Sequence, residues 1–382
     1  MLKVETITDA AGLARICPEW EDLAQTVSPR SPFATPLWNV TWWRHFGRKS
    51  LKAEDRLRIH SVRDDAGKLV AVAPMMLTVR PSVGPFRTRE LQFFGADSYV
   101  TEMRGPVCVA ERVAEVMPAL QAAFDGSAER WDWVQWRGVQ RSPVADDWLG
   151  RAVPSSRAFD LVDYVLDLPD SWEGFRALLP RNIKESLRKC YNSLTRDGHG
   201  FEFRVVEAPA EVDAAVGRFL ELHQHRADRS GTIAHANVFA TPTSRAFLHD
   251  YCRALAARGG LRVFQLVVAE TVIATRLGFL FGDELYLYFS GYAPEWGRYS
   301  VMTTTVAEAI KWAIAQRLRL VNLSTGTDVS KTRWRPREVH YAGGDLVADA
   351  LRSRLAHGVV DLMRRPAARP RSTAREPVAA SE

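Results

Sequence analysis

The sequence predicts an α/β (α+β) fold made of two similar domains in tandem. The first observation is the order strand, turn, strand, strand, helix, strand between Leu261 and Trp334. The second is a repeated pattern: a strand opening at 57–59, a turn and a strand opening at 69–71 match the same three features at 261–274. In both halves a helix and a strand then follow, at 113–139 and at 302–326. Agreement in order and spacing at three points indicates two related domains.

The domain limits follow from this repeat and from composition. We predict a first domain at residues 1–155, a second at 156–350 and a basic, disordered tail at 351–382. From Arg364 to Glu382 the chain has five arginines against two glutamates and is rich in Pro, Ala and Ser, a composition typical of disordered segments. The net charge is +6, so about half of it lies in this stretch. The remaining charge is too small to predict a general nucleic-acid-binding surface.

Composition also indicates which class of protein this is and in which compartment it is expected. The chain is 46% hydrophobic and 25% charged, as in ordinary globular proteins. No stretch approaches ~18 apolar residues, and the N-terminus lacks an apolar signal segment, so no membrane span is expected. Four cysteines lie far apart in sequence (Cys17, Cys108, Cys190, Cys252). Such spacing favours free thiols in a reducing cytoplasm over a zinc site or disulfide framework.

The first half begins with a strand at 3–8 and a helix at 10–26. A short helix at 37–46 carries three tryptophans; Pro36 suits its first position and Thr35 its N-cap. A hairpin across the turn at 64–67 follows. The helix at 113–124 and the strand at 133–139 complete this half.

The second half opens with a strand at 160–167 and a short helix capped by Asp170 or Ser171. A longer helix at 180–196 has an apolar stripe at helical spacing. Its opposite face carries Arg181, Lys184 and Arg188. These cations are either a solvated face or the ligands of an anionic substrate or phosphate.

Helices at 210–227 and 243–257 lead to the strands at 261–268 and 272–281, which are rich in β-branched and aromatic residues. A strand at 285–290 and a helix at 302–316 come next. This order places a helix N-terminus just beyond two strands, where a phosphate is favoured. It points to a transferase of the acyl-CoA type.

A set of short motifs occurs in a characteristic order along the chain: Ser31-Pro32-Phe33 with Trp38, Arg181-Asn182-Ile183-Lys184, Leu222-His223 with Arg226, Gly291-Tyr292, Tyr299-Ser300, and Gly326 with Lys331 and Trp334. The series resembles the GNAT superfamily of N-acyltransferases. More narrowly, it is similar to the acetyltransferase-like (CelD-type) family associated with cellulose and exopolysaccharide biosynthesis. That family is a relative of the tandem-domain Fem aminoacyl-ligases. The resemblance extends from Lys3 to about Val347.

The resemblance implies mixed, strongly curved sheets flanked by helices, in which the fourth and fifth strands splay apart to admit the pantetheine arm of acyl-CoA. Here those strands would be 272–281 and 285–290. The pyrophosphate would rest on the next helix, with Arg298, Tyr299, Ser300 and Val301 as the cofactor-binding residues. The usual R/Q-x-x-G-x-G/A loop is altered, because its glycine positions hold Val301 and Thr303.

Acyl transfer to an amine needs a base, donors for the thioester carbonyl and an acid for the leaving thiolate. The resemblance implies His223 as base or substrate contact, with an ordinary surface or core histidine as the alternative. Tyr299 is the candidate acid, with packing as the alternative. The remaining candidates would bind substrate: Arg181, Lys184, Arg226, Tyr288, Lys331 and Trp334. No metal is expected, since His223 and His225 lack further ligands nearby.

We therefore expect an N-acyltransferase that moves an acetyl or other acyl group from acyl-CoA to an amine. The acceptor would be a small molecule or saccharide, in polysaccharide or cell-envelope biosynthesis, with polysaccharide-synthesis proteins as partners. One alternative is a Fem-like aminoacyl transferase using charged tRNA, which would need a coherent basic face. Another is a non-catalytic accessory protein of polysaccharide assembly, which the missing glycines at Val301 and Thr303 favour.

Overall fold

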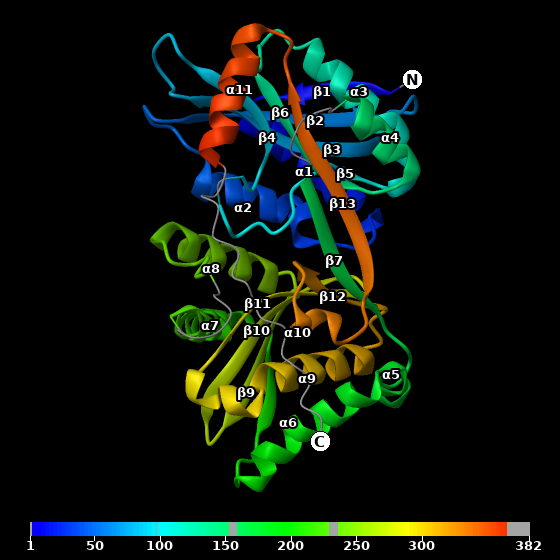
Figure 1. The fold of residues 1–382 in the computed structure, drawn as a ribbon, viewed down its shortest axis with the longest axis vertical. Coiled ribbons are helices and arrows are strands. Elements are labelled where there is room, and N and C mark those ends of the chain that lie inside the picture. The colour runs from blue at the N-terminus through cyan, green and yellow to red at the C-terminus, as the bar shows by residue number, and fades with distance from the viewer. Residues whose placement is uncertain (1, 97, 153–158, 229–235, 365–382) are drawn as a thin grey trace, which may run out of the picture.

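The computed structural model describes residues 2–96, 98–152, 159–228 and 236–364, and within them thirteen strands form one sheet (Figure 1). The sheet order is β1-β2-β3-β4-β6-β13-β7-β12-β11-β10-β9-β8, with β5 paired to β3. The strands are β1 (Lys3–Ile7), β2 (Glu54–Arg63), β3 (Leu69–Arg80), β4 (Thr88–Phe93), β5 (Val107–Cys108), β6 (Trp133–Gln140), β7 (Phe159–Asp167), β8 (Glu202–Val206), β9 (Leu261–Val268), β10 (Thr271–Phe281), β11 (Glu284–Tyr292), β12 (Leu320–Thr325) and β13 (Arg337–Val347).

Helices cover both faces of this sheet. They are α1 (Ala10–Thr26), α2 (Pro36–Phe46), α3 (Val113–Asp125), α4 (Pro143–Ala152), α5 (Trp172–Leu178), α6 (Arg181–Arg196), α7 (Val212–Ala227), α8 (Pro242–Ala256), α9 (Val301–Ala315), α10 (Val329–Thr332) and α11 (Leu351–Arg364). Short 3₁₀ turns occur at η1 (Pro32–Ala34), η2 (Ala110–Arg112), η3 (Pro209–Glu211) and η4 (Pro294–Tyr299). In the described part of the chain, no helix is long and apolar enough to cross a bilayer.

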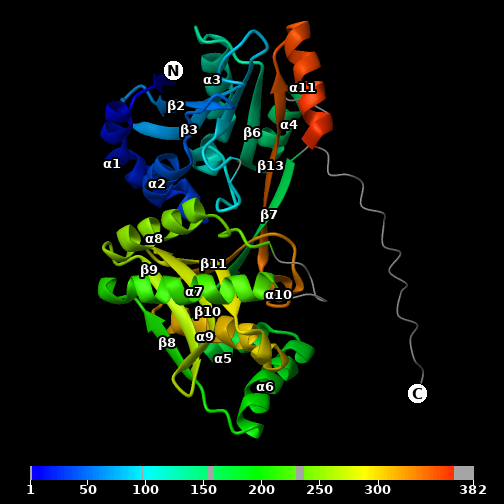
Figure 2. The same cartoon turned by 90° about the vertical axis from the view of Figure 1, so that its left-hand side faces the viewer.

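The two halves share one topology, which confirms the tandem α/β prediction. In the first lobe β2, β3 and β4 pair antiparallel and β6 joins β4 in parallel. In the second lobe β9, β10 and β11 pair antiparallel and β12 joins β11 in parallel. A helix, α3 or α9, precedes each parallel strand. Figure 2 shows the lobes stacked end to end.

Strands β7 and β13 tie the lobes together. The first part of β13, Arg337–Gly343, pairs with β7, and its second part, Tyr341–Val347, pairs with β6 of the first lobe. The chain thus returns to the first lobe before residue 350. The predicted boundary at 155/156 lies outside the described residues, as do 365–382. Disorder was wrongly predicted for residues 351–364, which form α11.

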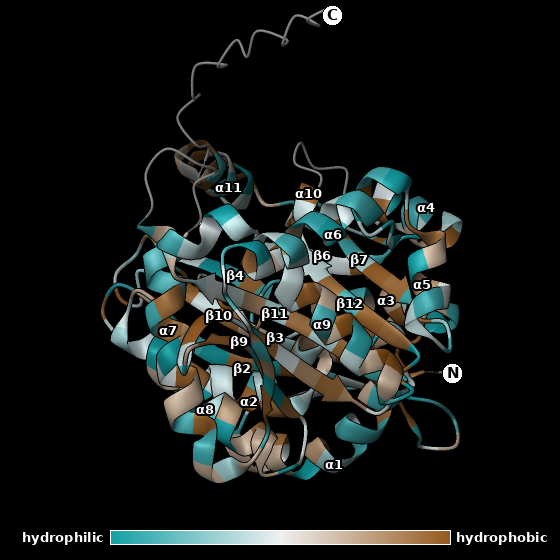
Figure 3. Cartoon of the chain, turned by 90° about the horizontal axis from the view of Figure 1, so that it is seen from below, coloured by the Kyte–Doolittle hydropathy of each residue, from teal (hydrophilic) through white to brown (hydrophobic). Residues whose placement is uncertain are grey.

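One aromatic cluster spans the lobe boundary. The side chain of Thr35 caps α2 by accepting from the Trp38 amide, and Pro36 occupies the first helical position. Trp38 is 1% exposed. Its ring meets Phe247 and Tyr251 of α8 and Tyr288 of β11, at centroid distances of 4.9, 4.7 and 5.7 Å. Edge-to-face contacts of this kind add to the burial energy, so α2 fixes the second lobe against the first. Figure 3 shows the apolar strands between helices with polar outer faces.

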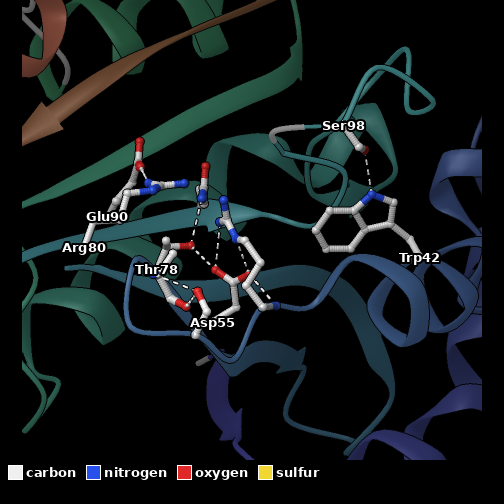
Figure 4. A network of polar contacts seen from close by, with 10 residues as sticks. Trp42, Asp55, Thr78, Arg80, Glu90 and Ser98 are labelled. Atoms are coloured by element: carbon white, nitrogen blue, oxygen red, sulfur yellow. Dashed lines mark hydrogen bonds and ion pairs between the residues drawn. The ribbon is translucent and has the colours of Figure 1, made fainter. Parts of the chain in front are cut away.

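A buried network of polar side chains links strands of the first lobe (Figure 4). Thr78 Oγ1 donates to Asp55 Oδ1 over 2.6 Å, and Arg48 Nε donates to Asp55 Oδ2 over 2.8 Å. Glu90 accepts from Arg80 NH1 at 2.5 Å. Buried charges that are paired in this way cost little and hold neighbouring strands in register. Beside it, Trp42 Nε1 donates to Ser98 Oγ over 2.7 Å.

Candidate active site

The sheet opens between β11 and β12. These strands pair in parallel at only three positions, from Glu284↔Leu320 to Tyr286↔Asn322, and then separate. The sequence-based expectation placed the opening between 272–281 and 285–290, and this was wrong. Those segments form the β10–β11 hairpin, paired from Ala274↔Tyr292 to Phe281↔Glu284. The strand that separates from β11 is β12, which follows α9. β12 is parallel to β11, and two parallel strands must be joined by a crossover such as this helix.

Arg276 on β10 occupies the point of separation. Its NH2 donates to the Leu287 carbonyl of β11 over 3.1 Å and to the Leu323 carbonyl of β12 over 3.5 Å. Both carbonyls lie beyond the paired stretch of the two strands. The guanidinium therefore donates to backbone carbonyls that are not paired between β11 and β12, because these strands have separated. Burial lowers the pKa of Arg276 to about 10.

A cavity of about 240 Å³ lies at this opening. Its walls come from β10, β11, β12, α9, α10 and a loop of the first lobe. Met302, Thr303 and Val306 bring the first turns of α9 to the cavity. The other lining residues are Glu102, Arg226, Arg276, Tyr288, Phe289, Ser290, Ser324, Thr325, Asp328, Ser330, Lys331 and Trp334.

The first lobe contributes one of the two carboxylates of this cavity, Glu102. Residues 98–106, in the segment before β5, extend to the second lobe, where Tyr288 donates its hydroxyl hydrogen to the Val100 carbonyl. The Tyr286 hydroxyl donates to Glu102 Oε2 over 2.7 Å. Trp38 Nε1 donates to Thr101 Oγ1 over 3.1 Å, which anchors the loop from the other side. Glu102 is thus held at the cavity from both lobes.

Lys331 also lines the cavity, where α10 follows β12. Its Nζ donates to Ser324 Oγ over 3.0 Å and to the Thr325 carbonyl. Ser324 has a left-handed backbone, φ +71°, and its amide donates to Asn322 Oδ1 over 2.7 Å. Strained backbone of this type is typical of functional sites. Asn322 Nδ2 in turn donates to Asp163 Oδ2 of β7 over 2.6 Å.

Burial changes the proton affinity of all three charged groups. Burial raises the pKa of Glu102, opposed by the Lys331 charge. Burial raises the pKa of Asp163 to about 7, although its hydrogen bond from Asn322 opposes this. Burial lowers the pKa of Lys331 to about 8, opposed by the Glu102 charge. Glu102 and Lys331 line the cavity, and charged groups with shifted pKa values in a cavity are characteristic of acid–base sites.

Four predicted substrate-binding residues line this cavity: Arg226, Tyr288, Lys331 and Trp334. Arg226 NH1 donates to Ser290 Oγ over 2.7 Å, and burial lowers the pKa of its guanidinium. The indole of Trp334 is 2% exposed and forms part of the wall. These residues come from α7, β11, α10 and the segment just after α10, so tertiary structure brings them together.

His223 does not line the cavity. Its ring is 4% exposed, its Nδ1 lies 3.0 Å from the Ser290 carbonyl, and Phe219, Phe239 and Phe289 surround it. A Cβ on Gly291 would lie 2.3 Å from the His223 backbone nitrogen, so glycine lets α7 pack directly on β11. His223 was expected to be the catalytic base, and its buried position corrects this. Its role is to support the wall that carries Ser290.

The four residues predicted to hold the cofactor lie at the start of α9 but outside the cavity lining. Tyr299 is 3% exposed, and its hydroxyl donates to Asp197 Oδ2 over 3.0 Å and accepts from Arg298 NH2 at 2.6 Å. Arg298 and Ser300 are exposed, whereas Val301 is buried in the core. Tyr299 therefore holds α6 and η4 together, a correction to its expected role as the acid.

Arg181 and Lys184 also lie elsewhere. Arg181 is exposed and pairs with Glu185 at an Nε–Oε1 distance of 2.9 Å. Lys184 lines a second pocket of about 230 Å³ between α5, α6 and α9, whose lining includes Arg176, Arg188 and Lys311. This gives α6 a basic face separate from the cavity.

Three important residues were not predicted from the sequence. Arg276 is the one charged residue of β10, and Asp163 lies among the apolar residues in the middle of β7. A charge in such a place is a sequence signal, because burying it without a partner is costly. Glu102 lies in a loop without periodicity, and no local pattern distinguishes it. In the described residues, no three His, Cys, Asp or Glu side chains are grouped to hold a metal ion.

Comparison with known proteins agrees with this arrangement. Residues 181–334 match the family described as an acetyltransferase (GNAT) domain. A search of curated proteins gives no match. Among solved structures, FemX is 12% identical with a TM-score of 0.61, over 94% of this chain and 100% of that chain. A conserved protein of unknown function from Bacteroides thetaiotaomicron is 13% identical with a TM-score of 0.49, over 90% and 99% of the two chains. A tandem GNAT protein from the clavulanic acid biosynthesis pathway is 12% identical with a TM-score of 0.44, over 91% and 100%.

Together these findings identify a GNAT-type domain in the second lobe and a FemX-like fold over nearly the whole chain. The matched segment begins at α6 and ends at Trp334, so it contains β11, α9, β12 and Lys331. It omits Glu102, which comes from the first lobe. The cavity is therefore completed by both halves.

Proposed function

We propose that this protein, which carries a GNAT-type domain at residues 181–334, is an N-acyltransferase that moves an acyl group from acyl-CoA to an amine. The observation that carries the proposal is the cavity between the parted strands β11 and β12, with Glu102 and Lys331 among its lining residues. At this opening an extended thioester arm can reach backbone N–H and C=O groups. In a closed sheet these groups would be hydrogen-bonded to the neighbouring strand.

The polar groups suit the steps of aminolysis. The Glu102 carboxylate, with its raised pKa, takes a proton from the attacking amine. The new C–N bond forms as the C–S bond breaks. The Lys331 ammonium stabilises the negative charge that passes from the carbonyl oxygen to the leaving thiolate. Arg226 lies in the same wall and is placed to bind an anionic group of either substrate.

The first turn of α9 is placed to bind the acyl donor. Met302 and Thr303 line the cavity, so the helix N-terminus faces it, and such a terminus favours phosphate. Val301 and Thr303 replace the usual glycines. The Thr303 hydroxyl accepts from Arg333 NH1 over 3.0 Å. We infer that the Arg333 guanidinium takes part in holding the phosphates where backbone access is reduced.

A thiol-release assay with acetyl-CoA and a panel of amines tests the proposal, together with isothermal titration. Wild-type protein should bind acetyl-CoA and release free thiol when an accepted amine is present. Thr303→Trp should fill the cavity and abolish binding. Ala315→Trp on the exposed end of the same helix is the matched control and should bind normally. Absence of heat and of thiol release at millimolar acetyl-CoA would contradict the proposal.

An aminoacyl transferase of the Fem type is the second candidate. The FemX-like fold over 94% of the chain and the basic face of α6 favour it. Filter binding with aminoacylated tRNA distinguishes the two: retention at sub-micromolar protein, without acetyl-CoA binding, would select this alternative. Binding of neither donor would leave the accessory role in polysaccharide assembly.

A further inference from the structure

Helix α11 packs in an unusual way, with its polar side inward. Ser353 Oγ donates to Asp132 Oδ1 over 2.7 Å, and His357 Nε2 lies 3.0 Å from Asp345 Oδ2. The His357 ring also contacts Trp133 at a centroid distance of 5.5 Å. These polar contacts hold α11 on the outer surface of the first lobe (Figures 1 and 2).

The apolar side of the same helix faces solvent. Five of its six large apolar residues are between 54% and 80% exposed: Leu351, Leu355, Val359, Leu362 and Met363. At 100° per residue they fall within one continuous arc, opposite Ser353 and His357. A helix normally buries such a stripe, so this one is left for a partner.

The loop between β3 and β4 extends the apolar surface. Val83 is 53% exposed and Phe86 is 86% exposed. Arg352 NH2 donates to the Arg87 carbonyl, which ties this loop to the first turn of α11. Phe86 thus lies next to the residue through which this loop contacts α11, and the exposed Arg352 and Arg354 add positive charge to the helix.

Positive charge is concentrated in the same part of the chain. Residues 351–382 contain seven arginines and three acidic residues, a net +4 of the total +6. An apolar helix face combined with clustered arginines is the pattern of a helix that lies in the interface of an anionic membrane.

Other occupants fit less well. Residues 365–382 have no aromatic residue and only one large aliphatic side chain, Val378, so they cannot supply an apolar cover. A second copy is disfavoured by charge, because two copies of this basic surface would repel each other.

We propose that α11 and the β3–β4 loop dock this protein on the surface of a bilayer that contains anionic phospholipid. The leucines and Phe86 enter the boundary between headgroups and acyl chains, while Arg352 and Arg354 contact phosphates. The helix lies in the plane of the surface and does not cross it.

Co-sedimentation with vesicles of phosphatidylcholine containing 30% phosphatidylglycerol tests the proposal. The full chain should sediment with these vesicles and bind at least ten-fold more weakly in 500 mM salt or to pure phosphatidylcholine. The triple variant Leu351→Ser, Leu355→Ser, Leu362→Ser should lose at least ten-fold in partitioning. The matched control is Leu51→Ser, Val144→Ser, Leu178→Ser, which removes three exposed apolar residues elsewhere and should bind like wild type.

Thermal unfolding of both triple variants checks that each is folded. Light scattering of the wild type without vesicles checks for a second copy. Any of four results would overturn the proposal: no vesicle binding, equal binding to neutral vesicles, equal binding by the two triple variants, or a dimer that the α11 variant abolishes.

Discussion

The Glu102 carboxylate and the Tyr286 hydroxyl join the two lobes at the candidate site, with an Oη–Oε2 distance of 2.7 Å. Glu102 belongs to a loop of the first lobe and Tyr286 to β11 of the second. Tyr286 is also the last β11 residue that pairs with β12. The relationship places a first-lobe acid at the point where the second-lobe sheet opens, so neither half forms the site alone.

Replacing Glu102 tests its assignment as the base. Glu102→Gln keeps the shape but cannot accept a proton, so kcat should fall by about 10²- to 10⁴-fold, with a smaller change in KM for the acyl donor. Steady-state thiol release measures both constants. Glu111→Gln, an exposed carboxylate of the same lobe, should leave them unchanged. Full activity in Glu102→Gln would remove Glu102 from the mechanism.

The charge of Lys331 should set the alkaline limit of activity. Since its pKa is lowered to about 8 by burial, kcat/KM should decline above about pH 8 as the ammonium loses its proton. Lys331→Arg keeps a positive charge, because arginine stays protonated, and its alkaline limb should move to higher pH. Lys331→Met should be inactive throughout. A pH–rate profile measures the limb, and an unchanged limb at pH 8 in Lys331→Arg would assign it to another group.

Asp163 should destabilise the folded protein at neutral and higher pH. Its folded pKa of about 7 exceeds its ordinary value of 3.8, so the folded state binds the proton more tightly. Its stabilising contribution is complete below about pH 4 and is lost as pH rises through 7. Asp163→Asn should therefore raise the free energy of unfolding at pH 8, by up to about 4 kcal/mol, and have little effect at pH 4.

Urea unfolding at the two pH values measures this difference. Asp167→Asn, at the exposed end of the same strand, is the control and should show no comparable gain at pH 8. A loss of stability in Asp163→Asn at pH 8 would mean that the ionised carboxylate is favourable in its pocket.

Arg276 should be essential to the opening between β11 and β12. Arg276→Met removes the donors to the Leu287 and Leu323 carbonyls. Each unsatisfied buried carbonyl costs about 1–3 kcal/mol, so for two carbonyls we expect the free energy of unfolding to fall by roughly 2–6 kcal/mol. Arg204→Met on the edge strand β8, at an exposed pair with Glu202, should cost under about 0.5 kcal/mol. Equal effects of the two variants would show that Arg276 does not stabilise the parted strands.

Much of the fold is encoded locally and was predicted from the sequence. The Thr35–Pro36 start of α2, the apolar stripe of α6 and the β9–β10 hairpin depend on contacts between residues close in the chain. Their periodicities and caps are therefore visible in a single sequence. The repeat of strand, strand, helix and strand predicted the tandem architecture for the same reason. Strands β4, β5, β8 and β13 were missed. Of these, β8 and β13 are defined by partners that lie far away in the sequence.

Tertiary structure alone decided the site. The sequence predicted the helix after β11 and the importance of Lys331 and Trp334, but it placed the opening between the two strands of a hairpin. Which strands part depends on the crossover through α9, and which acid enters the gap depends on a loop from the other lobe. Glu102 and Tyr286 are separated by 184 positions, and no local pattern encodes a contact over that distance. The sequence determines which chemical groups the protein has. Where these groups come together is determined by the packing of Trp38 and the aromatic cluster that holds the lobes together.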